Sequence, residues 1–84
     1  MDELIEVPLD NWLASFDGRV LEVFTPYRDG SMRYRAALMV DCLIDGSMLT
    51  VEFQRKEKGF WPFNDDQRPG VEALVQAVNT ARGF

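Results

Sequence analysis

Residues 38–53 read LMVDCLIDGSMLTVEF, where the step Asp45-Gly46 lies between two runs of alternating apolar and polar residues. Asp-Gly in this setting predicts a β-hairpin, because a type I′ turn needs positive φ at both central residues and its twist matches that of the strands. With Asp45 and Gly46 as the loop, the expected pairs are Ile44 with Ser47, Cys42 with Leu49, Val40 with Val51, and Leu38 with Phe53. Beyond the turn these pairs join apolar positions, whereas a one-residue slip would oppose an apolar face to a polar one.

The step Asp29-Gly30 predicts a second hairpin by the same rule. Counting outward from it gives the pairs Tyr27 with Met32, Thr25 with Tyr34, Val23 with Ala36, and Leu21 with Leu38. Both counts therefore place Leu38 on the inward face. Together the two turns predict strands near 19–28, 31–44 and 47–57, in an antiparallel meander of order 1-2-3.

The C-terminal segment has the periodicity of an amphipathic helix. Apolar residues recur at i, i+3, i+4 and i+7, namely Val71, Leu74, Val75 and Val78, and Arg82-Gly83 provides a basic last turn and a glycine stop. Asn64, Asp65 and Asp66 precede Pro69, which favours a helix start over a cation site, since the spaced pattern of a calcium loop is absent. We expect this helix to cover Leu38, Val40, Val51 and Phe53 on the inward face of the meander.

The N-terminal segment is expected to hold a short helix. Asp10 is a plausible N-cap for residues 11–16, and Asp17-Gly18 would end the segment. Residues 4–7 alternate weakly and are either a further strand or an extended lead-in, stopped by Pro8. The expected fold class is α+β, a single domain over residues 1–84 with element order α-β-β-β-α.

Composition excludes several chemistries. The chain has 84 residues, a formal net charge of -5, no histidine, and Cys42 as its only cysteine, which the register places in the core. Ser-His and Cys-His catalysis and the usual Cys/His zinc sites are therefore excluded. We expect no cofactor, no metal and no enzymatic activity, with a metal-dependent carboxylate enzyme as the remaining catalytic hypothesis. No apolar run approaches the roughly 18 residues of a membrane span, and the acidic start Met1-Asp2-Glu3 is unlike a secretory signal. A cytoplasmic location is expected.

The outward face of the meander carries a group of basic residues. The predicted register brings Arg33 opposite Lys58 and Arg35 opposite Lys56, with Phe24 beside Arg35. Like charges placed directly opposite are unfavourable by about 0.2–1 kcal/mol per pair, so this arrangement is not one that stability selects. Two interpretations remain open: a solvated face with an ordinary edge guard, or a basic and aromatic platform for an anionic partner.

The segment Gly59-Phe60-Trp61-Pro62-Phe63 is unusually aromatic for a connection between a strand and a helix. The aromatic side chains either plug one end of the core or form a surface anchor. Trp61 is the expected anchor residue if one of them is exposed, because tryptophan is enriched among the residues that dominate interface energetics.

These features predict a non-enzymatic interaction domain that binds a protein partner. In length, acidity and lack of catalytic groups the chain resembles the small phage and mobile-element proteins that inhibit host machinery, anti-CRISPR proteins among them. That resemblance implies action by occupying a surface. The alternative function is a nucleic-acid or anionic-ligand binding module that uses the basic face, although the net charge of -5 disfavours nucleic acid.

Overall fold

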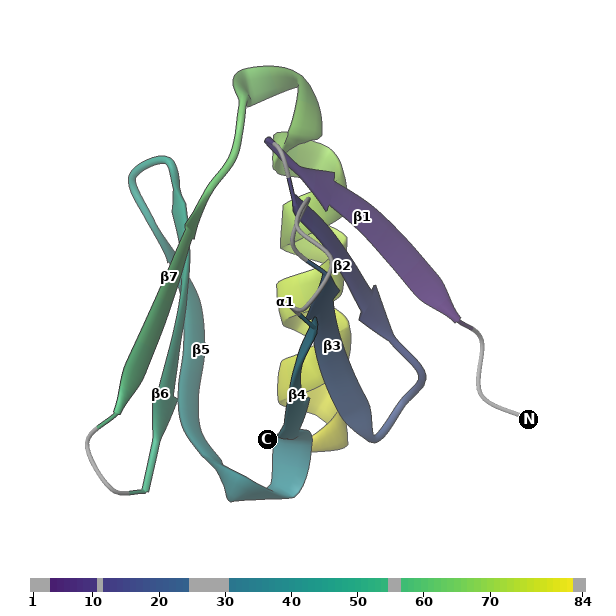
Figure 1. Ribbon diagram of the computed structural model, residues 1–84, viewed down its shortest axis with the longest axis vertical. Coiled ribbons are helices and arrows are strands. Elements are labelled where there is room, and N and C mark those ends of the chain that lie inside the picture. The colour runs from purple at the N-terminus through teal and green to yellow at the C-terminus, as the bar shows by residue number, and fades with distance from the viewer. Residues whose placement is uncertain (1–3, 11, 25–30, 55–56, 83–84) are drawn as a thin grey trace.

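The computed structural model describes residues 4–10, 12–24, 31–54 and 57–82 of the chain (Figure 1). It has two antiparallel sheets and one α-helix, which confirms the α+β class. The first sheet has the order β1-β2-β3-β4 and the second β5-β6-β7. The elements are β1 (Ile5–Leu9), β2 (Trp12–Phe16), β3 (Val20–Phe24), β4 (Ser31–Arg35), η1 (Ala36–Leu38), β5 (Met39–Asp45), β6 (Met48–Phe53), β7 (Lys58–Pro62), η2 (Asp65–Gln67) and α1 (Arg68–Ala81).

The predicted N-terminal helix is wrong, because that segment is a β-hairpin. Leu9 of β1 pairs with Trp12 of β2, so the connection is a two-residue turn beginning at Asp10, whose φ is 56°. Aspartate tolerates this left-handed conformation better than most residues. Asp10 therefore begins the turn of a hairpin and is not the N-cap of a helix. Pro8 lies inside β1, where it is tolerated because β1 is an edge strand.

The predicted strand over residues 31–44 is two strands. The 3₁₀ turn η1 separates β4 from β5, and the two strands belong to different sheets. A 14-residue strand would also exceed the usual strand length of roughly 3–10 residues. Leu38 lies in η1 and is 53% exposed, so its predicted inward position is wrong. The β3–β4 pairing is also shifted, since Leu21 opposes Tyr34 in place of Leu38. The Asp29-Gly30 turn itself lies outside the described residues.

The β5–β6 hairpin forms with a register two positions from the predicted one. Asp45 opposes Met48, so Gly46 and Ser47 are the loop residues, and Cys42 opposes Val51. Gly46 has a φ of 61°, while Ser47 is not among the described residues with positive φ, which matches the φ pattern of a type II′ turn. Val40 lies at an irregularity between the Met39 and Asp41 pairs, and its side chain is exposed.

The core lies between the two sheets and α1. Figure 1 shows α1 upright in the centre of the view, with the three-stranded sheet on its left and the four-stranded sheet on its right. The helix contacts β1 of one sheet and β5 of the other. Its buried residues Val71, Leu74 and Val78 confirm the predicted helical stripe, and Cys42 is buried as predicted. No helix in the described ranges is long and apolar enough to cross a membrane.

The predicted helix start at residues 64–66 is confirmed, with a 3₁₀ turn preceding α1. Asn64 and Gln67 form a capping box around η2. The Gln67 Oε1 atom accepts hydrogen bonds from the backbone N–H of Asn64 (2.9 Å) and of Asp10 (2.7 Å). This side chain therefore ties the helix start to the β1–β2 turn.

Candidate interaction surfaces

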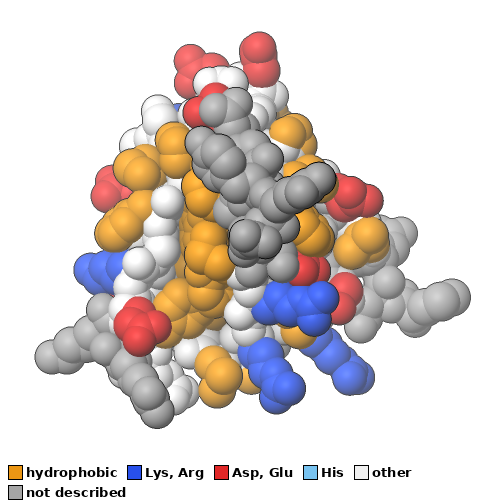
Figure 2. Space-filling view, viewed as in Figure 1, with side chains coloured by type: hydrophobic (Ala, Val, Ile, Leu, Met, Phe, Trp, Pro, Cys, Tyr) orange, Lys and Arg blue, Asp and Glu red, His pale blue; other side chains and the backbone are white. Residues whose placement is uncertain are grey.

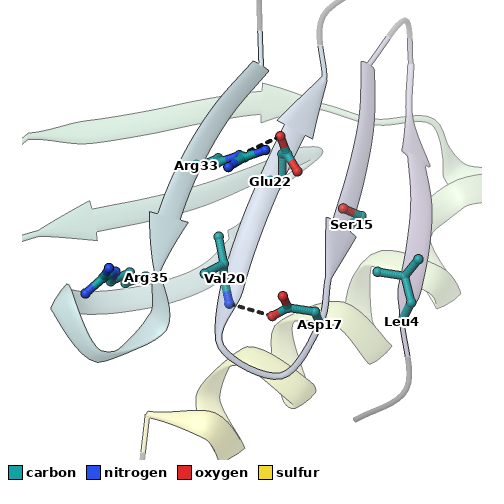
Figure 3. Close-up of a pocket in the computed structure, with 7 residues that line it drawn as sticks. All are labelled: Leu4, Ser15, Asp17, Val20, Glu22, Arg33 and Arg35. Carbon is teal, nitrogen blue, oxygen red and sulfur yellow. Dashed lines mark hydrogen bonds and ion pairs between the residues drawn. The ribbon is translucent and has the colours of Figure 1, made fainter.

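Two residues of the predicted basic platform, Arg33 and Arg35, lie on the outer face of β4. Arg33 opposes Glu22 of β3, and its Nε donates to the Glu22 carboxylate at 2.9 Å (Figure 3). The hydrogen bond and the charge of Glu22 raise the pKa of Arg33 above its ordinary value. The Arg33 side chain is nevertheless 74% exposed, against 19% for Glu22. The pair therefore orients Arg33 without removing it from solvent.

The Arg35 side chain forms no hydrogen bond or ion pair with another described residue. It opposes Val20 of β3, and in Figure 3 its side chain points away from the Arg33–Glu22 pair. It lines two shallow surface depressions of about 440 and 500 Å³, one shared with Arg33 and Glu22 and the other with Arg19. Figure 2 shows Lys and Arg side chains gathered at the lower right of the view. We call Arg19, Arg33 and Arg35 the arginine cluster.

The other members of the predicted platform do not join this cluster. Lys58 lies in β7 and opposes Glu52 of β6, so its predicted pairing with Arg33 is wrong. Lys56 lies outside the described residues. Phe24 opposes Ser31 at the far end of β3 from the Val20–Arg35 pair, so its predicted place beside Arg35 is also wrong. The platform fails because its third strand belongs to the second sheet.

Asp17, which lines the same depression as Arg33 and Arg35, accepts hydrogen bonds from the backbone. Its Oδ1 atom accepts hydrogen bonds from the N–H groups of Val20 (2.8 Å) and Arg19 (2.9 Å). These bonds, that from Val20 first, lower the pKa of the Asp17 carboxyl below its usual 3.8. Asp17 thus closes the connection between β2 and β3.

The aromatic segment is divided between core and surface. Trp61 and Phe63 are 2% and 5% exposed, while Phe60 is 51% exposed. The expectation that Trp61 is the exposed member is therefore wrong, and Phe60 takes that position. Trp61 also lies over Gly59, where an added Cβ would overlap Cη2 and lie 2.9 Å from Cζ3 of the indole ring. Glycine at residue 59 is what lets the indole ring pack into the core.

Phe60 belongs to an apolar surface on the outer face of the three-stranded sheet. Leu43, Thr50 and Phe60 are directly opposite one another across β5, β6 and β7, and Met48 opposes Pro62 in the next row. Leu43, Met48 and Phe60 are all exposed large hydrophobic residues. We call Leu43, Met48, Thr50, Phe60 and Pro62 the apolar face. Figure 2 shows hydrophobic side chains along its left flank, over the three-stranded sheet.

The apolar face has a charged rim. One bordering row consists of Asp41, Glu52 and Lys58, and Asp45 opposes Met48 at the other end. The Thr50 hydroxyl oxygen is covered and has no hydrogen-bond partner among the described residues. The accessible surface of the central row is therefore supplied mainly by Leu43 and Phe60.

The sequence does contain a signal for this surface that the alternation argument passed over. A strand with one solvated face alternates apolar and polar residues, whereas Cys42-Leu43-Ile44 and Met48-Leu49 are consecutive apolar residues. In the first run Cys42 and Ile44 face the core and Leu43 points outward. In the second run Leu49 faces the core and Met48 points outward. Consecutive apolar residues in a predicted strand therefore mark a second apolar face.

The described residues offer few groups suited to catalysis. No group of three or more His, Cys, Asp or Glu side chains among them is arranged to hold a metal ion. Burial raises the pKa of the Cys42 thiol from its usual 9.0 to about 11, which keeps the thiol protonated and unreactive at neutral pH. Comparisons with protein-family models, curated proteins and solved structures find no match.

Proposed function

We propose that the chain is a non-enzymatic interaction domain that binds a protein partner through the apolar face of the three-stranded sheet. The observation that supports this most is the row Leu43–Thr50–Phe60, which places two exposed hydrophobic side chains on one face of the sheet, on either side of Thr50. Full burial of an exposed side chain of this kind contributes about 1.5–3 kcal/mol. Because Leu43 and Phe60 are 38% and 51% exposed, a partner would add only the share that belongs to their exposed surface.

The arrangement has the anatomy of a recognition surface. Interfaces commonly have an apolar centre, rich in aromatic residues and methionine, surrounded by a polar rim. Here Phe60 lies in the central row and Met48 in the next one, and the rim residues Asp41, Asp45, Glu52 and Lys58 carry a net negative charge. We therefore expect the partner to present an apolar projection flanked by basic residues.

The size of the sheet limits the strength of this contact. The three strands are five to seven residues long, and at a spacing of about 4.8 Å they cover roughly a few hundred Å². A stable complex usually buries about 800 Å² on each partner. The apolar face by itself thus supports a transient complex, and a tight one requires contacts over the rim as well. Inhibition of the partner by occupation of its surface is the simplest activity of such a domain.

Capture from extracts of the native host tests the proposal. The immobilised protein is compared with a Leu43→Thr/Phe60→Thr variant, because threonine keeps the β-propensity of both positions while removing most of the apolar surface. A Val20→Thr/Phe24→Thr variant on the outer face of β3 is the matched control. Proteins retained by the wild type and the control but lost by the first variant support the proposal. Capture that is unaffected by Leu43→Thr/Phe60→Thr contradicts it, provided thermal denaturation shows that all three proteins are folded.

A further inference from the structure

Each sheet has two edge strands, and within the described part of the chain three of the four edges carry either a proline or a covering side chain from α1. β1 contains Pro8, which removes a backbone donor. The outer edge of β5 is covered by α1, where Asn79 Nδ2 donates to the carbonyl oxygen of Cys42 at 3.0 Å and Arg82 donates to that of Val40. β7 ends in Pro62, whose backbone nitrogen lies on the edge away from β6 and has no hydrogen to donate.

The fourth edge, that of β4, carries neither. Ala36 donates its N–H to the Arg19 carbonyl at 2.9 Å, so the alternate residues Tyr34 and Met32 also direct their backbone groups toward β3. The N–H and C=O groups of Ser31, Arg33 and Arg35 consequently face away from the sheet. In the described part of the chain, the N–H and C=O groups of Ser31 and Arg33 and the N–H of Arg35 have no hydrogen-bond partner, whereas the Arg35 carbonyl accepts the first hydrogen bond of η1. β4 contains no proline, so an extended chain can pair with it from Ser31 to the Arg35 N–H.

The side chains along this edge select for acidic residues. Arg33 uses only Nε for Glu22, which leaves its two Nη groups as donors. Arg35 extends from β4 on the side away from β3 (Figure 3). Basic side chains on an edge strand discourage pairing with a second basic strand, and the same charges attract an acidic one. Because Arg33 and Arg35 are two residues apart, they lie on one face of the edge.

The opposite face of the same edge is apolar. Tyr34 lies between the two arginines in sequence and points inward, where it borders a groove of about 380 Å³ together with Leu38 and Phe53. Gln54 and Glu57 complete the lining of this groove. A residue that pairs near Tyr34 on an added strand would direct its side chain toward this groove.

We propose that the edge of β4 binds an extended segment of a protein partner in which two acidic residues flank one apolar residue. The segment adds a fifth strand to the first sheet. Its carboxylates pair with Arg33 and Arg35, and its apolar side chain lies beside Tyr34. A second copy of this chain does not supply the segment, because none of its 14 acidic residues stand two positions apart. This surface is separate from the apolar face, so either proposal can fail alone.

Fluorescence anisotropy with synthetic peptides of about nine residues tests this inference, a length that spans one strand with flanking residues. The probe alternates glutamate with valine, and the control peptides carry lysine for glutamate or the same residues in scrambled order. Two further probes carry N-methyl groups on alternate residues. In one probe these groups block the N–H donors of one edge of the extended peptide, and in the other probe they block those of the opposite edge. Saturable binding of the alternating acidic peptide, abolished by one N-methyl set and retained with the other, is the expected result. Equal behaviour of the two N-methyl sets, or no binding, overturns the proposal.

Protein variants identify the surface. Arg33→Gln/Arg35→Gln should weaken binding of the acidic peptide by about tenfold or more, the loss expected for two charge-assisted contacts. Arg33→Pro should weaken it further than Arg33→Gln, because it also removes an N–H from the open edge. Lys58→Gln, a charge loss on the other sheet, is the control and should leave the affinity unchanged. The proposal is wrong if Lys58→Gln weakens binding of the acidic peptide as much as Arg33→Gln/Arg35→Gln does. It is also wrong if Arg33 and Arg35 bind single-stranded DNA and not the peptide.

Discussion

Tyr34 of β4 stacks on Phe53 of β6, with ring centroids 4.6 Å apart and an angle of 27° between the ring planes. Tyr34 also contacts Trp61 of β7, with centroids 5.8 Å apart and the rings tilted by 59°. The helix links the sheets through β1 and β5, and these aromatic contacts link them on the side of β4 and β7. The pKa of Tyr34 is raised, first by burial and then by the charge of Glu57.

A double-mutant cycle measures this link. Tyr34→Leu and Phe53→Leu each remove one ring, and the coupling free energy of the pair should be about 0.5–1.5 kcal/mol, the usual value for aromatic pairs. Urea denaturation of the four proteins gives the value. The matched cycle with Tyr34 and Phe60, an exposed ring on the outer face of its sheet, should give a coupling near zero. Equal couplings in the two cycles would show that the sheets are not joined through Phe53.

Gly59→Ala should destabilise the protein. The added methyl group would overlap the Trp61 indole, and relieving that overlap requires the ring to leave its position in the core. Overpacking of this kind typically costs about 1–3 kcal/mol. The change should appear as a lower midpoint in urea with altered tryptophan fluorescence. Lys58→Ala, at an exposed position of the same strand, should leave both signals near the wild-type values.

The Cys42 thiol should react slowly with a disulfide reagent in the native protein and rapidly after denaturation, because it is 2% exposed and its pKa is raised to about 11. The raised pKa also makes stability depend on pH. Between about 9 and 11 the unfolded thiol releases its proton before the native one, so the free energy of unfolding falls as the pH rises. A Cys42→Ala variant should lack that component in thermal scans. Fast labelling of native protein at neutral pH would contradict the buried position.

Asp17→Asn tests the charge that closes the β2–β3 connection. The folded carboxyl has its pKa lowered below 3.8, so its contribution to stability is complete above that pH and is lost as the pH falls through the folded value. Asparagine keeps an oxygen that can accept both backbone hydrogen bonds but lacks the charge. The variant should therefore melt below the wild type at neutral pH and at the same temperature as the wild type in strong acid. A difference that persists unchanged into acid would assign the effect to geometry.

Matching of apolar faces identified the inward side of most strand residues but not their partners. The true pairings differ from the predicted ones by two positions at Gly46 and by four in the β3–β4 pair. Because side chains alternate with a period of two, every even shift keeps the same residues on the same face. Val51 and Val23 are buried under either register. Only the turn geometry distinguishes such registers. The observed loop Gly46-Ser47, with glycine first, gives a register two positions from the one that an Asp45-Gly46 loop would give.

The break between β4 and β5 had no comparable local signal. Residues 31–36 alternate, Ala36 to Val40 are consecutive apolar residues, and the turn at Ala36–Leu38 contains neither glycine nor proline. Its cause is tertiary, since the chain must leave one sheet and enter the other around the shared core. That single turn places Arg33 and Lys58 in different sheets and removes the predicted basic platform. Arg33 and Arg35 could be placed on an outer face from sequence, whereas the row that contains Phe60 required the second sheet.

Site-specific photo-crosslinking in the native host tests the central claim most directly. A photoreactive phenylalanine analogue replaces Phe60 on the apolar face in one protein and Phe24 on β3 in another. Both positions are exposed aromatic sites in β-strands. An interaction domain that uses the apolar face should give a discrete crosslink to one protein partner from position 60 and none from position 24. A partner crosslinked from position 24 and not from position 60 would contradict the account.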